Sequence, residues 1–445
     1  MVKKAKAWFI LILQRLWITA DLYSMNGLSN HAAAGAYGFL LSSAPALLMV
    51  SFFLSRAIAS SPEAVAELIQ QTGFLQGKFD IPGLIKTFLA SSHPGVTGII
   101  SAVSILWTAR ICALSIQRGL GVIFPNSKKT SPIRFFAAPA GLEFLIILFI
   151  FITVLSSRIA IVFYNSLEFV PISFTLSALT EFTVRTIPFF CLALMTLAAY
   201  RLIPPVPPAF KDAFKGMIFC VVLFRLFSLG FRLIINPARY NLIYGALGSL
   251  LLLLVNVYFF FIFFFLGAQL TYVIHSFDAL LFIRFRKFHS FSSSAKTNGI
   301  KLAEQKLFAS HKGLLGKKYF KKYKEGEIIL SKEKNGNEVY YVLQGEAGVF
   351  LDKELKHKIA VIKSGEFFGE MEHILKDDSQ TGPNAIITAD TDLSALALPP
   401  GLFSLIMKTD PETDRKLIKL LSKRLQNANQ LVIRGEGVNT LNQEP

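Results

Sequence analysis

The sequence predicts an all-α bundle of six membrane-spanning helices, followed by a C-terminal β-barrel or jelly-roll domain with flanking helices. Three observations lead to this prediction. Of the 445 residues 53% are hydrophobic and only 17% are charged, whereas an average soluble domain has about 25% charged residues. Residues 242–266 contain no charged side chain, and this run is long enough to cross a bilayer. Beyond residue 300, short alternating runs separated by glycine are typical of small antiparallel sheets.

Charge is distributed unevenly along the chain. Residues 1–290 hold 23 Lys and Arg but only 9 Asp and Glu. The basic residues gather at the N-terminus, in alternate loops between the hydrophobic runs and after the last run, as in cytoplasmic loops of membrane proteins. Because these clusters flank hydrophobic segments, the pattern does not indicate nucleic-acid binding. We expect a multi-pass protein of the cell inner membrane, with the lipid bilayer as its partner and both termini in the cytoplasm.

The hydrophobic part divides into an interfacial helix and six spans. Residues 1–30 are expected to form an amphipathic helix in the membrane interface, because their apolar run is too short and too interrupted to span. Residues 31–283 then form the six-span domain, in which each apolar segment has about the 20 residues that a membrane-spanning helix needs. The expected spans are residues 31–58, 95–124, 133–163, 179–202, 214–235 and 240–274.

The composition changes to that of a soluble protein after residue 283. Residues 284–300 are basic and rich in serine, and we expect them to be a linker. Residues 301–432 are expected to form a cytosolic domain with helices at about 301–312 and 411–430, and residues 433–445 a flexible tail. Between the two helices the expected strands are residues 327–330, 339–345, 347–351, 358–362, 385–389 and 393–398.

Ionisable residues fall inside the predicted spans. The central ones are Arg110, Glu143 and Arg225. A charge in the hydrocarbon core is costly, so such residues face one another or a water-filled cavity. Two interpretations stay open. Either Glu143 pairs with an arginine and lines a polar path for a charged substrate, or these residues form a structural ion pair or extend to the interface. We favour the second interpretation.

Four motifs stand out in the hydrophobic part. They are HAAAGAYGFLLSSAPALLMV (31–50), LWTAR (106–110), RLIPP (201–205) and IYGALGSLLLLLVNVYFFFIFFFLGAQL (243–270). In this order they resemble the YihY/BrkB family of inner-membrane proteins, over about residues 5–285. The resemblance implies a six-span helical fold with cytoplasmic termini. Family members have been labelled ribonucleases, virulence factors and transporters.

The ribonuclease label can be compared with the residues. Metal-dependent hydrolysis of a phosphodiester needs clustered His, Asp or Glu ligands. The seven histidines are scattered along the chain, and no two of them form a ligand motif. We therefore expect no metal site, no catalytic residues and no enzymatic activity.

A second set of motifs lies in residues 301–432. They are YKEGEIIL (323–330), EVYYVLQGEAGVFL (338–351), IKSGEFFGEM (362–371), TADTDLSALALPPGLFSLI (388–406) and RKLIKLLSKRL (415–425). Their order and spacing resemble a cyclic-nucleotide-binding domain of the Crp type. The resemblance implies a β-barrel or jelly-roll fold and a pocket for a cyclic nucleotide, which would be the only cofactor of the chain.

The same resemblance implies which residues would line that pocket. In the family, N–H groups after a Phe-Gly-Glu motif hold the cyclic phosphate, the glutamate holds the ribose hydroxyl, and a downstream arginine pairs with the phosphate. The motif is present, but no Lys or Arg occurs between Lys376 and Lys408. We therefore expect that the domain does not bind cyclic AMP or GMP in the usual way. It is an interaction or regulatory module, or it binds a different ligand. The candidate pocket is Phe368, Gly369, Glu370, Met371, Asn384 and Ala385.

Together these features favour a transporter or lipid-handling protein of the cell envelope that is regulated by its cytosolic domain. The expected partners are a small-molecule or lipid substrate and a protein that binds the C-terminal domain. Two alternatives stay open: a non-transporting scaffold that organises envelope partners, and a membrane-associated ribonuclease, which is the weakest of the three.

Overall fold

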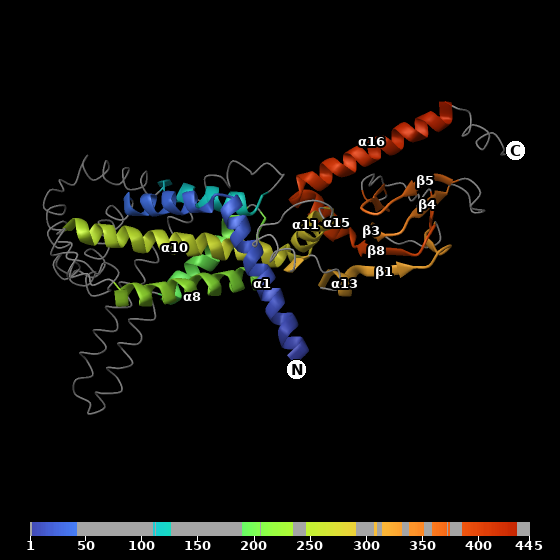
Figure 1. The fold of residues 1–445 in the computed structure, drawn as a ribbon. Helices are drawn as coiled ribbons and strands as arrows, with labels where there is room; N and C mark the ends of the chain where they lie inside the picture. Colours follow the sequence, from blue (N-terminus) through green and yellow to red (C-terminus); the bar gives the residue numbers. More distant parts are fainter. Residues whose placement is uncertain are drawn as a thin grey trace, which may run out of the picture. The chain divides into compact units, whose positions relative to one another are not determined.

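The chain folds into two compact units in the computed structural model (Figure 1). The helical unit comprises residues 15–275, and the C-terminal unit comprises residues 1–14 together with 276–445. The structure describes residues 2–41, 110–111, 113–125, 189–204, 206–234, 246–290, 307–308, 314–331, 338–350, 358–371, 373 and 385–433.

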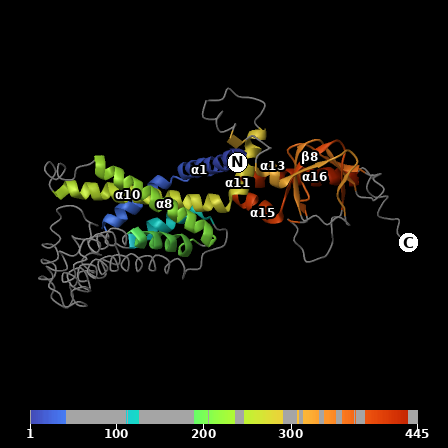
Figure 2. The same cartoon turned by 90° about the horizontal axis from the view of Figure 1, so that it is seen from below.

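Two long helices form the centre of the helical unit. Helix α8 (Phe210–Ile234) lies beside helix α10 (Ala246–His275), as Figures 1 and 2 both show. Each contains a segment that is long and apolar enough to cross a membrane, Phe210–Phe231 and Leu251–His275. These segments overlap the last two predicted spans, 214–235 and 240–274.

Glycines bring α8 and α10 close together. A Cβ atom on Gly216 would lie 2.5 Å from the carbonyl oxygen of Gly267, and a Cβ on Gly267 would lie 2.7 Å from the carbonyl oxygen of Gly216. The two backbones therefore touch at a point where any side chain would clash. Small residues are used in this way at helix interfaces in membranes, where close packing replaces the hydrophobic effect.

Aromatic rings fill the space between these helices beyond the glycine contact. Phe227 of α8 stacks on Phe259 of α10 with 4.2 Å between the ring centroids, and Phe224 meets Phe260 edge to face at 5.3 Å. The hydroxyl of Tyr200 is fully buried and donates a hydrogen bond of 2.5 Å to the carbonyl oxygen of Phe264. The phenylalanine-rich segment of α10 therefore packs against α8 and against the helix that carries Tyr200. The same residues make α10 apolar over the length that a membrane span needs.

The other predicted spans are described only in part. Residues 28–41 are helical, as are 110–111 and 113–123, and the described residues of the fourth predicted span include the apolar helix Phe189–Leu202. The third predicted span, 133–163, lies outside the described residues. Six spans therefore stay a prediction, and the described residues contain two helices that meet the length and composition of a span.

Helix α1 (Val2–Met25) covers the expected N-terminal helix. Its exposed apolar side chains include Trp8 (67% exposed) and Phe9 (64%). Such side chains suit the membrane interface, where large aromatic residues are common. The position of α1 in that interface stays a prediction.

The C-terminal unit is built from two four-stranded antiparallel sheets. One has the strand order β1-β8-β3-β6 and the other β2-β7-β4-β5. A buried apolar cluster that includes Val342, Leu393 and Ala395 forms its core. The strands are β1 (Phe320–Tyr323), β2 (Ile328–Leu330), β3 (Val339–Gln344), β4 (Ala347–Phe350), β5 (Lys358–Ile362), β6 (Phe367–Phe368), β7 (Ile386–Ala389) and β8 (Leu393–Leu398).

Six of these eight strands match the runs predicted from alternation. The two that the sequence does not reveal are β1 and β6. Strand β1 carries two exposed lysines at its centre, and β6 has only two residues. Neither offers the four to eight alternating residues by which a strand is recognised.

Helices also flank the sheets in the described part of residues 276–445. They are α11 (Phe277–Ser290), α13 (Leu314–Tyr319), α15 (Pro400–Thr409) and α16 (Pro411–Ile433). Helix α16 covers the predicted helix at 411–430. Residues 284–290, the first part of the expected linker 284–300, are helical in α11, and residues 291–300 lie outside the described residues. Phe282 and Phe285 of α11 are buried, which is why this segment belongs to the C-terminal unit.

Candidate functional site

The Phe-Gly-Glu motif begins at Phe368, the last residue of strand β6, at the edge of the β1-β8-β3-β6 sheet. Phe368 is buried and stacks on Tyr340 of the neighbouring strand, with 4.9 Å between the ring centroids and 8° between the ring planes. Gly369 has a φ of +78°, and a Cβ on it would lie 2.9 Å from the carbonyl oxygen of Glu338. Only glycine adopts this conformation without strain. The stacked ring and the turn at Gly369 together direct the next residue, Glu370, inward.

Glu370 is a buried carboxylate in contact with helix α16. Only 1% of its side chain is exposed. The Nη1 atom of Arg424 donates a hydrogen bond of 2.5 Å to its Oε1 atom, and Nη2 of the same arginine donates one of 2.7 Å to the carbonyl oxygen of Phe367. One guanidinium group, that of Arg424, therefore holds the last residue of the motif and the residue just before the motif.

Burial and the charge of Arg424 change the pKa of the Glu370 carboxyl in opposite directions. Burial raises the pKa of the Glu370 carboxyl above its usual value, because the ionised form loses its hydration. The Arg424 guanidinium lowers that pKa, but the effect of burial is larger. The ion pair is thus an incomplete compensation for the buried charge.

The second oxygen of the same carboxylate is unsatisfied. Glu370 Oε2 is buried and has no hydrogen-bond partner among the described residues. A buried acceptor without a donor costs about 1–3 kcal/mol, and such groups in folded proteins call for an explanation. An O–H or N–H donor on a bound ligand would satisfy this oxygen.

Of the other predicted pocket residues, the structure describes Met371 and Ala385. Met371 follows Glu370 and is 49% exposed, and Ala385 is half-buried just before strand β7. Asn384 lies outside the described residues. The structure thus brings Phe368, Gly369 and Glu370 together through their adjacency in sequence.

Sequence reasoning missed Arg424. It is 54 residues from Glu370 in the chain, outside the segment between Lys376 and Lys408 in which the resemblance places a phosphate-pairing cation. The available signal was its place in RKLIKLLSKRL (415–425), a helix whose other basic residues are exposed.

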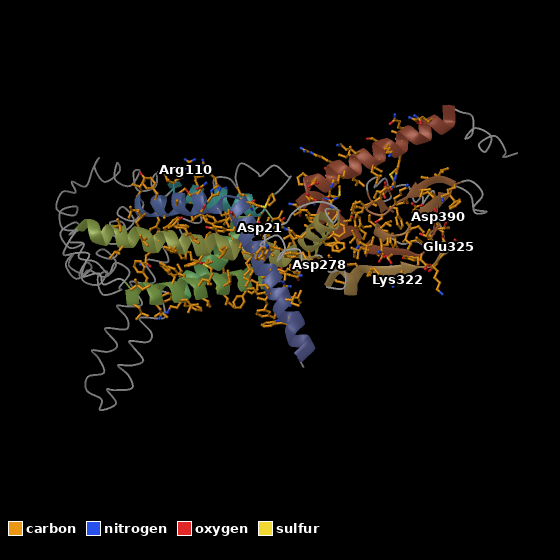
Figure 3. All side chains as sticks on the ribbon, viewed as in Figure 1. Asp21, Arg110, Asp278, Lys322, Glu325 and Asp390 are labelled. Carbon is orange, nitrogen blue, oxygen red and sulfur yellow. The ribbon has the colours of Figure 1, made fainter. Side chains whose placement is uncertain are left out.

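Two of the three charged residues predicted to lie within the spans, Arg110 and Arg225, are among the described residues. The guanidinium of Arg225 in α8 lies over the ring of Phe189, with its central carbon 4.2 Å from the ring centroid. Such a cation–π contact stabilises an arginine that has left water. Arg110 (labelled in Figure 3) is half-buried near the start of residues 110–123. Glu143 lies outside the described residues, so its predicted pairing with either arginine stays a prediction.

Polar contacts also connect residues of the hydrophobic motifs. Gln269 is buried, and its Oε1 atom accepts a hydrogen bond of 3.3 Å from Asn26. Arg201 donates one of 2.5 Å to the carbonyl oxygen of Pro208. Both contacts hold the backbone or neighbouring helices in place. No group of three or more potential metal ligands occurs among the described residues.

Comparison with known proteins decides the family of the helical part. Residues 19–280, more than half of the chain, match the family described as "Virulence factor BrkB". The chain belongs to the BrkB family. A UPF0761 membrane protein of Pseudoalteromonas atlantica is 29% identical over 261 residues, which cover 57% of this chain and 83% of that protein. A second one, from Haemophilus influenzae, is 28% identical over 254 residues, covering 56% and 90%.

This BrkB-family chain carries a further domain. Residues 320–410 match the family described as "Cyclic nucleotide-binding domain". The catabolite activator protein of Thermus thermophilus is 23% identical over 26% of this chain, with a TM-score of 0.23, and the match spans 54% of the activator. The c-di-GMP-responsive regulator CLP of Xanthomonas campestris is 19% identical over 28% of this chain and 68% of its own, with a TM-score of 0.24. The relatives of the helical part are named as membrane proteins, and no catalytic family is indicated.

Proposed function

We propose that this BrkB-family protein is a multi-pass transporter or lipid-handling protein of the inner membrane, and that its C-terminal unit regulates it by binding a small ligand. The observation that supports the regulatory part is the buried Glu370 carboxylate, whose Oε2 atom has no hydrogen-bond partner within the described part of the chain. An acceptor of this kind fits a ligand that donates hydrogen bonds, such as the hydroxyl groups of a ribose.

The proposed ligand is recognised through its hydroxyl groups more than through a phosphate. The segment between Lys376 and Lys408 contains no Lys or Arg, and Arg424 is already bound to Glu370 and the Phe367 carbonyl. A charged hydrogen bond to a phosphate contributes about 1.5–3 kcal/mol, or roughly ten- to a hundredfold in affinity. Without that contact, a cyclic nucleotide would bind with an affinity close to that of the corresponding nucleoside.

Calorimetry on the purified full chain tests this preference. Adenosine carries the ribose hydroxyls without a phosphate, and cyclic AMP adds the phosphate. We expect their dissociation constants to lie within about tenfold of each other, and we expect Glu370→Gln to weaken both. Binding of cyclic AMP at least a hundredfold tighter than adenosine would show that a phosphate-pairing cation exists after all. Absence of binding by both would leave the domain as a protein-interaction module.

The transport part rests on the charged residues of the helical unit. A flux assay in proteoliposomes, with fluorescent phospholipids and with charged solutes, compares the wild type with Arg110→Gln, Glu143→Gln and Arg225→Gln. We expect at least one of these variants to lower a flux that protein-free vesicles do not show. Flux equal to that of empty vesicles for every probe would count against transport.

One observation favours the scaffold alternative. The guanidinium of Arg225 packs on Phe189, so this charge has a structural partner within the helices. A scaffold would show no flux and would retain an envelope partner through residues 301–432. Stable co-purification of such a partner, lost when that domain is deleted, would support the scaffold.

A further inference from the structure

Helix α11 joins the C-terminal unit to the last predicted span without a linker. It begins at Phe277, two residues after α10 ends at His275. Its Phe282 is fully buried and meets the rings of Tyr341 and Phe367, at centroid distances of 5.3 Å and 6.1 Å. Because α11 is packed in the C-terminal unit and follows α10 directly, this unit stays near the membrane in which α10 is expected to lie.

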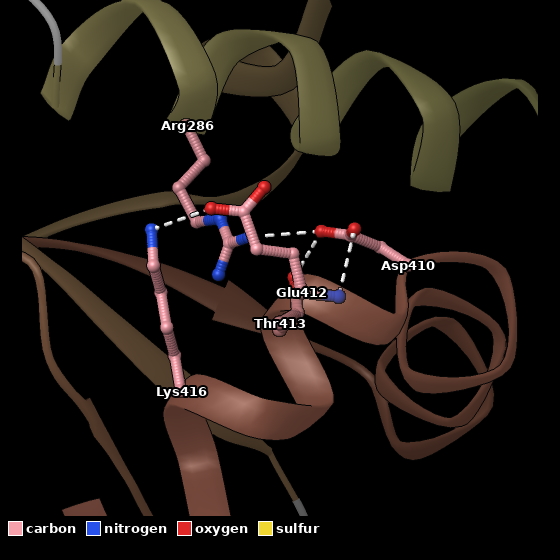
Figure 4. A network of polar contacts seen from close by, with 5 residues as sticks. All are labelled: Arg286, Asp410, Glu412, Thr413 and Lys416. Atoms are coloured by element: carbon pink, nitrogen blue, oxygen red, sulfur yellow. Dashed lines mark hydrogen bonds and ion pairs between the residues drawn. The ribbon is translucent and has the colours of Figure 1, made fainter. Parts of the chain in front are cut away.

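Helix α16 is held to the C-terminal unit by one of its faces (Figure 4). The Nη2 atom of Arg286 in α11 donates a hydrogen bond of 2.8 Å to Oδ2 of Asp410, just before α16 begins. Asp410 also accepts hydrogen bonds from the Thr413 hydroxyl and the Glu412 N–H group, so it caps the helix. Thr413 and Leu417 are buried. The first turns of α16 are therefore fixed on one side only.

The other side of α16 presents two lines of exposed residues. Arg415, Lys419 and Lys423 are exposed and follow one another at intervals of four residues, which places them along one line of the helix. Ile418 is 56% exposed and Leu425 is 64% exposed. These two apolar residues are seven positions apart and form a second line beside the basic one.

The charge of this side is of one sign. Residues 415–433 contain five Lys and Arg but no Asp or Glu. Two of the five cations have acidic partners, because Arg424 binds Glu370 and Lys416 lies 3.1 Å from a carboxylate oxygen of Glu412 (Figure 4). The three cations of the exposed line are additional to these. A helix that carries apolar and basic side chains next to each other is typical of segments that lie on anionic membranes.

We propose that the exposed side of α16 docks on the anionic phospholipid surface of the membrane that holds the helical unit. Ile418 and Leu425 enter the boundary between headgroups and acyl chains, and the line of Arg415, Lys419 and Lys423 contacts the lipid phosphates. This docking does not depend on the ligand proposed for Glu370.

Charge favours lipid over a second copy of the chain as the occupant of this surface. Two α16 helices that met through it would each contribute three cations, and residues 415–433 offer no carboxylate to separate them. Like charges in such contact repel one another. An anionic surface instead attracts each cation. Two apolar side chains would hold a free helix only weakly, but the attachment through α11 makes the docking intramolecular, so weak contacts are sufficient.

Hydrogen–deuterium exchange on the full chain in nanodiscs tests the docking. The discs hold one copy each and consist of phosphatidylcholine, either alone or with about one third phosphatidylglycerol. We expect amides of residues 415–433 to exchange about tenfold more slowly in the mixed discs. The difference should disappear at about 1 M salt, which screens exposed charges. Equal exchange in the two lipids would overturn the docking.

A charge variant has a matched control in the same domain. Lys419→Gln with Lys423→Gln should remove most of the difference between the two lipids. Lys324→Gln with Lys363→Gln removes the same charge from exposed positions outside α16 and should leave that difference unchanged. The readout compares two lipids for one variant, so a general change of stability does not alter it. Equal effects of the two variants would contradict a site on α16.

The apolar line has its own variant. Ile418→Ser with Leu425→Ser keeps every charge and changes only exposed side chains. We expect this variant to lose the slower exchange in mixed discs, since the helix can no longer enter the acyl boundary. Full retention of the slower exchange would contradict insertion of these side chains.

Discs that hold two copies address the other occupant. Protection of α16 that requires two copies and is equal in both lipids would identify a second copy of the chain and overturn the proposal. Protection that one copy shows, and only in the mixed discs, would support docking on lipid.

Discussion

At the scale of single residues, the C-terminal unit places an acid where water does not reach. One oxygen of Glu370 is bound by Arg424, and its Oε2 atom has no hydrogen-bond donor among the residues that the structure describes. A protein that needed only a stable barrel would gain from an apolar side chain here, since buried ion pairs are often no better than well-packed apolar groups. The buried Glu370 carboxylate therefore supports the proposed ligand site.

The pH dependence of stability is the first prediction at this scale. The pKa of Glu370 is raised in the folded chain above its usual value of 4.5, so the folded state binds the proton more tightly than the unfolded state. Its contribution is fully present below about pH 4.5 and is lost as the pH rises through the raised pKa. We expect the unfolding free energy of the wild type to fall relative to Glu370→Gln between pH 4 and pH 8, as measured by urea unfolding.

The neighbours of Glu370 set the size of this effect. Arg424 lowers its pKa, and the charge of Glu366 raises it. In Arg424→Gln the loss of stability with rising pH should therefore be steeper than in the wild type. A wild-type profile that runs parallel to that of Glu370→Gln would show that the carboxyl titrates normally.

Substitution of Gly369 is the second prediction. Gly369→Ala places a Cβ 2.9 Å from the Glu338 carbonyl oxygen at a φ of +78°, whereas Gly365→Ala has a similar φ of +89° and open space around it. Both substitutions strain the backbone by about 1–2 kcal/mol, but only Gly369→Ala adds a clash with the backbone. We expect the first to lower the urea midpoint clearly more than the second. Equal losses would mean that the turn at Gly369 is not constrained by the neighbouring strand.

At the scale of elements, the α8–α10 pair shows how the helical unit is held together. The reciprocal contact of Gly216 and Gly267 lets two backbones touch, and Tyr200 binds the backbone of α10 beside it. Both glycines are therefore packing residues that let the two helices approach closely.

Substitution at this contact is the third prediction. Gly267→Ala would bring a Cβ within 2.6 Å of the Tyr200 hydroxyl and 2.7 Å of the Gly216 carbonyl oxygen. Overpacking of this kind costs about 1–3 kcal/mol, so the thermal midpoint of the detergent-solubilised protein should fall. The control is Gly230→Ala in α8, where nothing lies within 4 Å. An equal fall of the thermal midpoint in Gly230→Ala would show that the loss of stability does not come from the contact between Gly216 and Gly267.

At the scale of the whole molecule, the chain joins a BrkB-family membrane part to a domain similar to cyclic-nucleotide-binding domains. Its topology gives the fourth prediction. Tags at Met1 and Pro445 should both be accessible only from the cytoplasmic side, because basic residues flank both ends of the hydrophobic part. Tags on opposite sides of the membrane would require an odd number of spans.

Much of this organisation could be predicted from the sequence, because it follows from local patterns. Six strands alternate clearly, and the apolar runs of α8 and α10 are long. Two features could not be found in this way. The pairing of Arg424 with Glu370 joins residues 54 positions apart, and the packing of α11 depends on Phe282 meeting rings from two different strands. Both are tertiary contacts between segments that look ordinary in isolation.

The position of α11 determines how the C-terminal domain can be separated from the membrane. A fragment cut near residue 296, where the serine-rich stretch suggests a natural break, would lack Phe282 and Arg286. The rings of Tyr341 and Phe367 would then face solvent, and Asp410 would lose its cation. Such a fragment should aggregate. A fragment that begins at Ser276 contains helix α11, which shields these rings from water. A natural protease that cleaves within residues 291–300 would leave helix α11 attached to the membrane part. The released domain would then expose the apolar surface formed by Tyr341 and Phe367.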